Sequence, residues 1–307
     1  MPLARCMVSF AAVGVAAFAI GAEKDAEEDE ATPEQEPLDI ETVYYAQDGL
    51  LTAALDNVRF SSHDLAEVYF VGFAPDAAED VFETEVKHVE ALFREKFGAE
   101  GRTVLLINSR NTVDELPLAN GPNLVTVLEG MAERMGPEDL LFLHITTHGS
   151  RDHELSVSFE NLGLNDLSAA EVGDIVGGAG LPWRVVVVSA CFSGGFIKAL
   201  KSPRTMVITA ASARRTSFGC ENGRDYTYFG AAFYRDSLID ADFHAAFDRA
   251  VPLVREREEE QDYKHSRPQI WVGREIAAKL PHAWNLTGPV SPSGANAPVV
   301  ESLRAMP

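Results

Sequence analysis

The stretches LLFLHITTHGS, residues 140–150, and WRVVVVSACFSGG, residues 183–195, decide the fold class. Each contains an apolar run without polar alternation, which is typical of a parallel strand covered on both faces. The first run leads to His148, and the second leads to Cys191. Because the carboxyl ends of neighbouring parallel strands meet in one crevice, the two strand ends predict a cysteine nucleophile beside its base.

The same alternation of strand and helix extends on both sides of these stretches. Apolar runs predict further strands at residues 67–73, 103–108, 205–210 and 269–273. Apolar residues at helical spacing predict helices at 79–97 and 122–135, and residues 228–260 are expected to be mostly helical. Ser168 and Glu171 have the spacing of a capping box that opens another helix. Repeated strand–helix–strand units predict an α/β fold with a mainly parallel sheet between two helical layers.

The two ends of the chain are expected to lie outside this domain. Residues 1–22 contain an uncharged run, MVSFAAVGVAAFAIGA, with small residues at its end, and are interpreted as an export signal. A membrane anchor is the alternative, although the run is shorter than the ~20 residues that span a bilayer. Residues 23–65 are expected to form an acidic linker and N-terminal extension, residues 66–280 the folded domain, and residues 281–307 a flexible tail. The protein is therefore expected to be periplasmic or extracellular, with membrane contact only if the first segment stays uncleaved.

Composition excludes several kinds of site. The formal net charge of −21 argues against binding to nucleic acid, which requires a basic surface. The three cysteines are too few for a disulfide scaffold and lack zinc-site spacing. His144 and His148 would lie ~13 Å apart along a strand, so no metal or other cofactor is expected and His144 is interpreted as a core or wall histidine. Cleavage after residue 22 would remove Cys6 and leave Cys191 and Cys220. A disulfide between these two cysteines is the alternative to a free Cys191 nucleophile.

The motifs around these residues resemble a known family. His148-Gly149 follows one apolar strand, Ser189-Ala190-Cys191 follows a second, and TAASARRTSFGC occupies residues 209–220. Residues 67–273 resemble the bacterial branch of the legumain-like cysteine peptidases, which are relatives of the caspases and of the glycosylphosphatidylinositol transamidase catalytic subunit. The resemblance implies a caspase-like three-layer α/β/α sandwich, a polypeptide substrate, Cys191 as nucleophile and His148 as general base.

Chemistry supports the same assignment. A thiol near its ordinary pKa is mostly protonated at neutral pH, so acyl transfer requires a nearby imidazole to take its proton. The backbone N–H groups of Gly149 and Cys191 are the candidates for an oxyanion hole. Asp152 is a candidate to orient His148, although an acid at this spacing more often forms a turn.

Substrate preference is predicted less directly. Legumains that cut after asparagine have an acid two positions before the nucleophile, where this chain has Ser189, and another after Tyr-x-Gly, where it has Ala231. Ser189, Ser212 and Arg214 are nevertheless the candidate substrate-binding residues. An inward Arg214 would favour an acidic or amide side chain, whereas the alternative is that it faces solvent or pairs with a surface acid.

The sequence therefore predicts a cysteine-type endopeptidase that acts through a Cys191 thioester. Transamidation by the same pair of residues is one alternative, because an amine can replace water. A non-catalytic relative that binds extended peptides is the other. The sequence carries no prediction of the oligomeric state.

Overall fold

The computed structural model describes residues 37–62, 65–240 and 242–283. The expected export signal, Cys6 and residues 284–307 of the expected tail lie outside these ranges. Among the residues described, no helix combines the length and apolar character needed to cross a membrane.

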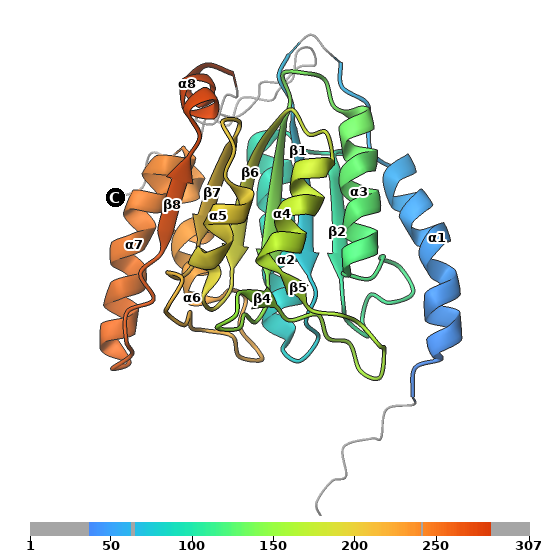
Figure 1. The fold of residues 1–307 in the computed structure, drawn as a ribbon, viewed down its shortest axis with the longest axis horizontal. Coiled ribbons are helices and arrows are strands. Elements are labelled where there is room, and N and C mark those ends of the chain that lie inside the picture. Colours follow the sequence, from blue (N-terminus) through green and yellow to red (C-terminus); the bar gives the residue numbers. More distant parts are fainter. Residues whose placement is uncertain (1–36, 63–64, 241, 284–307) are drawn as a thin grey trace, which may run out of the picture. The chain divides into compact units, whose positions relative to one another are not determined.

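A six-stranded sheet forms the centre of the domain (Figure 1). Its strands run in the order β2-β1-β3-β6-β7-β8, and only β8 is antiparallel to its neighbour. All residues of β1 and β3 are buried, which explains why their sequences show no polar alternation. The predicted mainly parallel sheet is confirmed. The strands span Val68–Ala74 (β1), Thr103–Ile107 (β2), Leu140–Thr146 (β3), Trp183–Ser189 (β6), Thr205–Thr209 (β7) and Gln269–Val272 (β8).

Helices cover both faces of the sheet, as the three-layer prediction requires. The chain leaves β1 for β2 on one side and then returns to β3 on the other side, so right-handed crossovers place α2 and α3 on opposite faces. Helices α4 and α5 share the face of α3, and α7 shares the face of α2 (Figure 1). The fold is an α/β caspase-like arrangement. These helices span Asp80–Phe97 (α2), Gly121–Arg134 (α3), Ala169–Gly178 (α4), Ile197–Leu200 (α5) and Phe243–Glu260 (α7).

Several local predictions are also confirmed. The capping box of α4 is formed in both directions between Ser168 and Glu171. Residues 228–260 are mostly helical, with α6 at Tyr228–Gly230, a π-helical turn at Ala231–Arg235 and a 3-10 turn at Leu238–Asp240 before α7. The short antiparallel strands β4, Glu154–Leu155, and β5, Leu167–Ser168, were not predicted because two-residue strands have no periodicity to detect.

Two further helices were also not predicted. Helix α1, Ile40–Asp56, lies within residues 23–65, for which the sequence analysis assigned no element. Its Leu51 belongs to the core cluster of the α3 face, and Leu55 lies against Gly130 of α3. Helix α8, Arg274–Ala283, follows β8 directly. Among the described residues, α1 is the first helix, and Asp39 is its N-cap.

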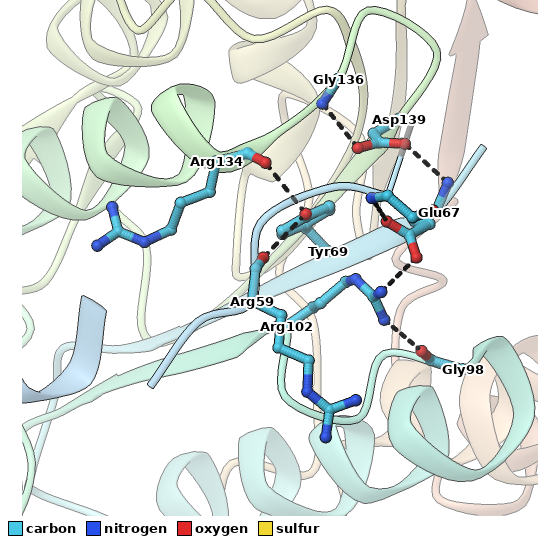
Figure 2. Close-up of polar contacts among 9 residues, drawn as sticks. Arg59, Glu67, Tyr69, Gly98, Arg102, Arg134, Gly136 and Asp139 are labelled. Atoms are coloured by element: carbon cyan, nitrogen blue, oxygen red, sulfur yellow. Dashed lines mark hydrogen bonds and ion pairs between the residues drawn. The ribbon is translucent and has the colours of Figure 1, made fainter. Parts of the chain in front are cut away.

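Polar contacts connect the chain segments at the amino-terminal edge of the sheet (Figure 2). The backbone N–H of Glu67 donates to the Asp139 carboxylate at 2.8 Å, and Arg102 pairs with the Glu67 carboxylate. The hydroxyl of Tyr69 lies 3.0 Å from the carbonyl oxygen of Arg59. Burial, followed by the charge of Asp139, raises the pKa of Tyr69 to about 12, so the hydroxyl stays a donor. Glu67 thus connects Asp139 and Arg102 at this edge of the sheet.

Candidate active site

The structure brings His148 and Cys191 to the same edge of the sheet. Strands β3 and β6 are parallel neighbours, and their last paired residues are Thr146 and Ser189. His148 and Cys191 each lie two residues beyond this pair, so they are level with each other at adjacent strand ends. A Cβ atom placed on Gly149 would lie 2.2 Å from the carbonyl oxygen of Cys191. Only glycine allows the two loops to approach this closely.

A glutamate from another part of the chain holds the His148 ring. The Nε2 atom of His148 lies 2.6 Å from Oε2 of Glu79, the N-cap residue of α2. The Phe82 ring meets the imidazole edge-on, with ring centroids 5.1 Å apart and an interplanar angle of 88°. Because a carboxylate only accepts hydrogen bonds, the proton lies on Nε2 and the lone pair of the neutral ring lies on Nδ1. The arrangement leaves Nδ1 available as a base.

Topology explains why Glu79 reaches this position. The strand order reverses between β1 and β3, and side chains from the loops that follow such strands meet in the crevice there. Glu79 ends the loop after β1, and His148 lies in the loop after β3. Asp152, the candidate for this role from the sequence, is exposed, and the carboxylate that bonds His148 belongs to Glu79. The predicted start of the helix at residue 79, directly after a strand, was the signal that could have identified it.

Cys191 is a partly buried, free thiol. Its Sγ atom accepts a hydrogen bond from the Ser217 backbone N–H at 3.3 Å and lies 3.5 Å from the Ser217 carbonyl oxygen. Burial raises the pKa of the Cys191 thiol, and the Ser217 N–H offsets part of this effect. Cys220 is also free, so the two residues do not form the disulfide considered as an alternative. The sulfur is therefore a protonated thiol at neutral pH and depends on a base for activation.

A strained turn follows the thiol. Phe192 has a φ of +57°, in the left-handed region that bulky residues rarely adopt. Its N–H donates to the carbonyl oxygen of Arg215 at 2.7 Å, and its own carbonyl accepts from Gly195 at 3.0 Å. Such strain persists only where surrounding contacts over-determine the backbone, and it concentrates at functional sites.

Two backbone N–H groups near the thiol have no internal acceptor. Within the described ranges, neither the Gly149 nor the Cys191 amide donates a hydrogen bond to another residue. Gly149 forms an isolated antiparallel bridge with Leu155, but its flanking residues make the hydrogen bonds of that bridge. Both amides predicted for an oxyanion hole are available to a ligand.

A buried polar network lies beneath the site. The Glu85 carboxylate bonds Nε2 of His144 at 3.1 Å, and the other ring nitrogen of His144 accepts from the Tyr234 hydroxyl at 2.9 Å. Thr227 donates to Glu85 through both its N–H, at 2.7 Å, and its hydroxyl, at 2.8 Å. Burial raises the pKa of Glu85, but the bonds from His144 and Thr227 outweigh it and hold the value below normal. His144 is thus a core histidine, as the sequence analysis expected. Glu85 was missed, although an acid within the apolar face of a helix was a visible signal.

Metal-ligating residues do not gather at this site. Across residues 37–62, 65–240 and 242–283, no group of three or more histidine, cysteine or acidic residues is arranged to hold an ion.

Comparison with protein-family profiles matches residues 116–278, just over half of the 307 residues, to the peptidase C13 family. The chain belongs to this family. Membership supports a cysteine peptidase or transamidase kind of function and implies polypeptide substrates. His148 and Cys191 both lie within the matched residues, whereas Glu79 and Glu85 precede them. A search of curated proteins found no match.

Two of the three candidate substrate-binding residues of this peptidase C13 family member line a cleft, and the third, Ser189, is buried. Ser189 is 2% exposed, and its hydroxyl lies 3.2 Å from that of Thr227 in the buried network. Ser212 and Arg214 instead line an open cleft together with Arg215. The structure brings Ser212 and Arg214 together and separates Ser189 from them. Because side chains alternate along a strand, Ser189 lies on the same face of β6 as the buried Val187, where its hydroxyl meets Thr227.

Proposed function

We propose that the protein is a cysteine endopeptidase with Cys191 as nucleophile and His148 as general base. The observation that carries this proposal is the level placement of the two residues at adjacent strand ends, with Glu79 bonded to Nε2 of His148. A bonded Nε2 directs the basic Nδ1 lone pair to the other side of the ring. Burial keeps the thiol protonated until this base acts.

The proposed reaction has two stages. In the first, Nδ1 of His148 takes the proton from Cys191 as Sγ attacks the carbonyl carbon of the substrate, and the amides of Gly149 and Cys191 donate to the oxyanion. The imidazolium then protonates the leaving amine, and a thioester remains on Cys191. In the second stage, His148 deprotonates a water molecule that attacks the thioester and releases the acid and the thiol. An amine that replaces this water would give transamidation by the same residues.

The setting of this reaction follows from the N-terminal sequence. We infer that residues 1–22 direct export, which would place the peptidase in the periplasm or outside the cell. Retention of the segment would tether the domain to a membrane.

Reactivity of the thiol tests the proposal. With iodoacetamide at pH 7, Cys191 of the wild type is expected to react at least about tenfold faster than Cys191 of His148→Ala. In the variant the rate should keep rising beyond pH 9, because burial raises the thiol pKa above its ordinary value of 9.0. Mass spectrometry locates the adduct, and the partly buried Cys220, whose pKa is raised further by burial, serves as the slow internal reference. Equal rates for Cys191 in the two proteins would contradict the role of His148.

Glu79 is expected to act as a positioning residue for the base. Glu79→Ala should lower kcat roughly 10- to 100-fold with little change in KM, because general-base catalysis requires the correct tautomer. Glu79→Gln should recover part of the loss, since its amide oxygen still accepts from Nε2. The exposed Asp152 offers the matched control, and Asp152→Ala should change kcat by no more than about twofold. A larger loss in Asp152→Ala than in Glu79→Ala would reverse the assignment.

A further inference from the structure

An open cleft lies at the carboxyl-terminal edge of the sheet, between the loop after β7 and the start of β8. Its volume is about 580 Å³, within the range of small-ligand sites. Its lining is strongly basic and consists of Ser212, Ala213, Arg214, Arg215, Arg267 and Gln269. We call it the arginine cleft.

One wall of the arginine cleft runs beside the proposed nucleophile. This wall segment consists of residues 212–217. The carbonyl oxygen of Arg215 accepts a hydrogen bond from the Phe192 N–H, and the Ser217 N–H donates one to Cys191 Sγ. A Cβ atom placed on Gly194 would lie 2.5 Å from the amide nitrogen of Ala213, so the wall and the turn after Cys191 are in direct contact. A polypeptide positioned for attack by Cys191 therefore passes within a few residues of this cleft.

The three arginines of the cleft have no internal counter-charge. Within the described ranges, the guanidinium groups of Arg214, Arg215 and Arg267 make no hydrogen bond or ion pair. The chain has 47 acidic residues against 26 lysines and arginines, so acidic partners are abundant. Several arginines elsewhere pair with acids; Arg102, for example, pairs with Glu67 at the opposite edge of the sheet (Figure 2).

Three like charges lining one cleft repel one another unless an anion joins them. Guanidinium groups bind carboxylates through paired, parallel N–H donors, which gives both strength and geometric selectivity. The Gln269 amide and the Ser212 hydroxyl add neutral donors to the same cleft. The cleft thus offers donors in excess and, from its side chains, few acceptors.

We propose that the arginine cleft binds an acidic side chain of the polypeptide substrate, within a few residues of the bond that is cut. This inference rests on the proposed peptidase function, because it assigns the cleft to the same substrate. The net charge of −21 opposes general attraction of acidic peptides, so a preference for them would come from the local cleft.

Binding to the full chain with Cys191→Ala tests this inference without requiring turnover. The probes are fluorescein-labelled decapeptides of neutral sequence in which one aspartate is placed at each position in turn, each with an asparagine counterpart. At 0.15 M salt, aspartate in at least one position should strengthen binding at least about tenfold over asparagine, as expected for charge-assisted hydrogen bonds.

Substitution of the three cleft arginines shows whether a preference for aspartate comes from the cleft. With Arg214→Gln, Arg215→Gln and Arg267→Gln combined, the aspartate-to-asparagine ratio should fall to no more than about twofold. Arg204, which pairs with Glu275 at 2.9 Å near the other end of β7, provides the control, and Arg204→Gln should keep the ratio. Absence of measurable binding, equal binding of every peptide pair, or a ratio that survives the triple substitution would overturn the inference. Failure of the peptidase proposal would instead be seen in the reactivity of the Cys191 thiol.

Discussion

Replacing Cys191 by alanine is expected to abolish peptide cleavage, with kcat/KM at least about 10³-fold below the wild type. The thioester route has no other nucleophile at the site, because the only other cysteine of the described residues, Cys220, is more deeply buried and its pKa is raised further. His148→Ala should cause a nearly equal loss, since residues that act as one unit have effects that do not add. Cleavage of a quenched peptide library, followed by mass spectrometry of the products, provides the measurement.

Cys220→Ser is the matched control for this loss. It also removes one thiol near the site, yet Cys220 packs against the apolar cluster of α2 and β1 and has no place in the proposed reaction. The serine variant should therefore retain most of the activity. Unchanged cleavage in Cys191→Ala, or loss in Cys220→Ser alone with an intact circular dichroism spectrum, would refute the mechanism.

The largest effect on stability is expected at Glu85. Its carboxylate is fully buried and bonds His144 and Thr227, so Glu85→Ala leaves these groups without their acceptor. Breaking a buried pair by removing one partner costs about 3–5 kcal/mol. The free energy of unfolding, measured by urea denaturation at pH 7, is expected to fall by this amount.

Two comparisons sharpen the Glu85 test. Glu95 is exposed on the same helix, and Glu95→Ala should change the free energy of unfolding by no more than about 0.5 kcal/mol. The net effect of its bonds lowers the pKa of Glu85 below the ordinary value of 4.5, so its stabilisation is complete above that pH. The stabilisation is lost as the pH falls through the lowered pKa of the folded state. A loss below about 1 kcal/mol in Glu85→Ala would mean that the network carries little stability.

The Glu85 network also accounts for the serine at position 189, where legumains that cut after asparagine have an acid. Thr227 joins the Glu85 carboxylate to the Ser189 hydroxyl, two residues before the nucleophile. An acid at position 189 would bring a second carboxylate toward Glu85 within a closed interior, which like-charge repulsion disfavours. The Ser189 hydroxyl thus belongs to the buried network beneath the site, and the proposed selection of a substrate by charge falls to the arginine cleft.

Sequence predicted the strands that lead to His148 and Cys191 because their signal is local. A strand buried on both faces has an apolar centre, so the run of four valines at residues 185–188 identified the strand observed as β6, Trp183–Ser189. Helix α1 and strands β4 and β5 have weaker local patterns and appeared only in the structure. Because β3 and β6 are adjacent parallel strands, His148 and Cys191 lie together at the same edge of the sheet.

From its sequence alone, this protein is recognisable as an α/β chain with a thiol and an imidazole at adjacent strand ends. The tertiary structure decided which acids bond the histidines: Glu79 bonds His148 from 69 residues away, and Glu85 bonds the core residue His144 from 59 residues away. It also decided that Arg214, Arg215 and Arg267 line one cleft, with no acidic partner among the residues that the structure describes. Apolar periodicity is a property of consecutive residues, whereas a hydrogen bond or ion pair requires two atoms within about 3 Å, whatever their separation along the chain.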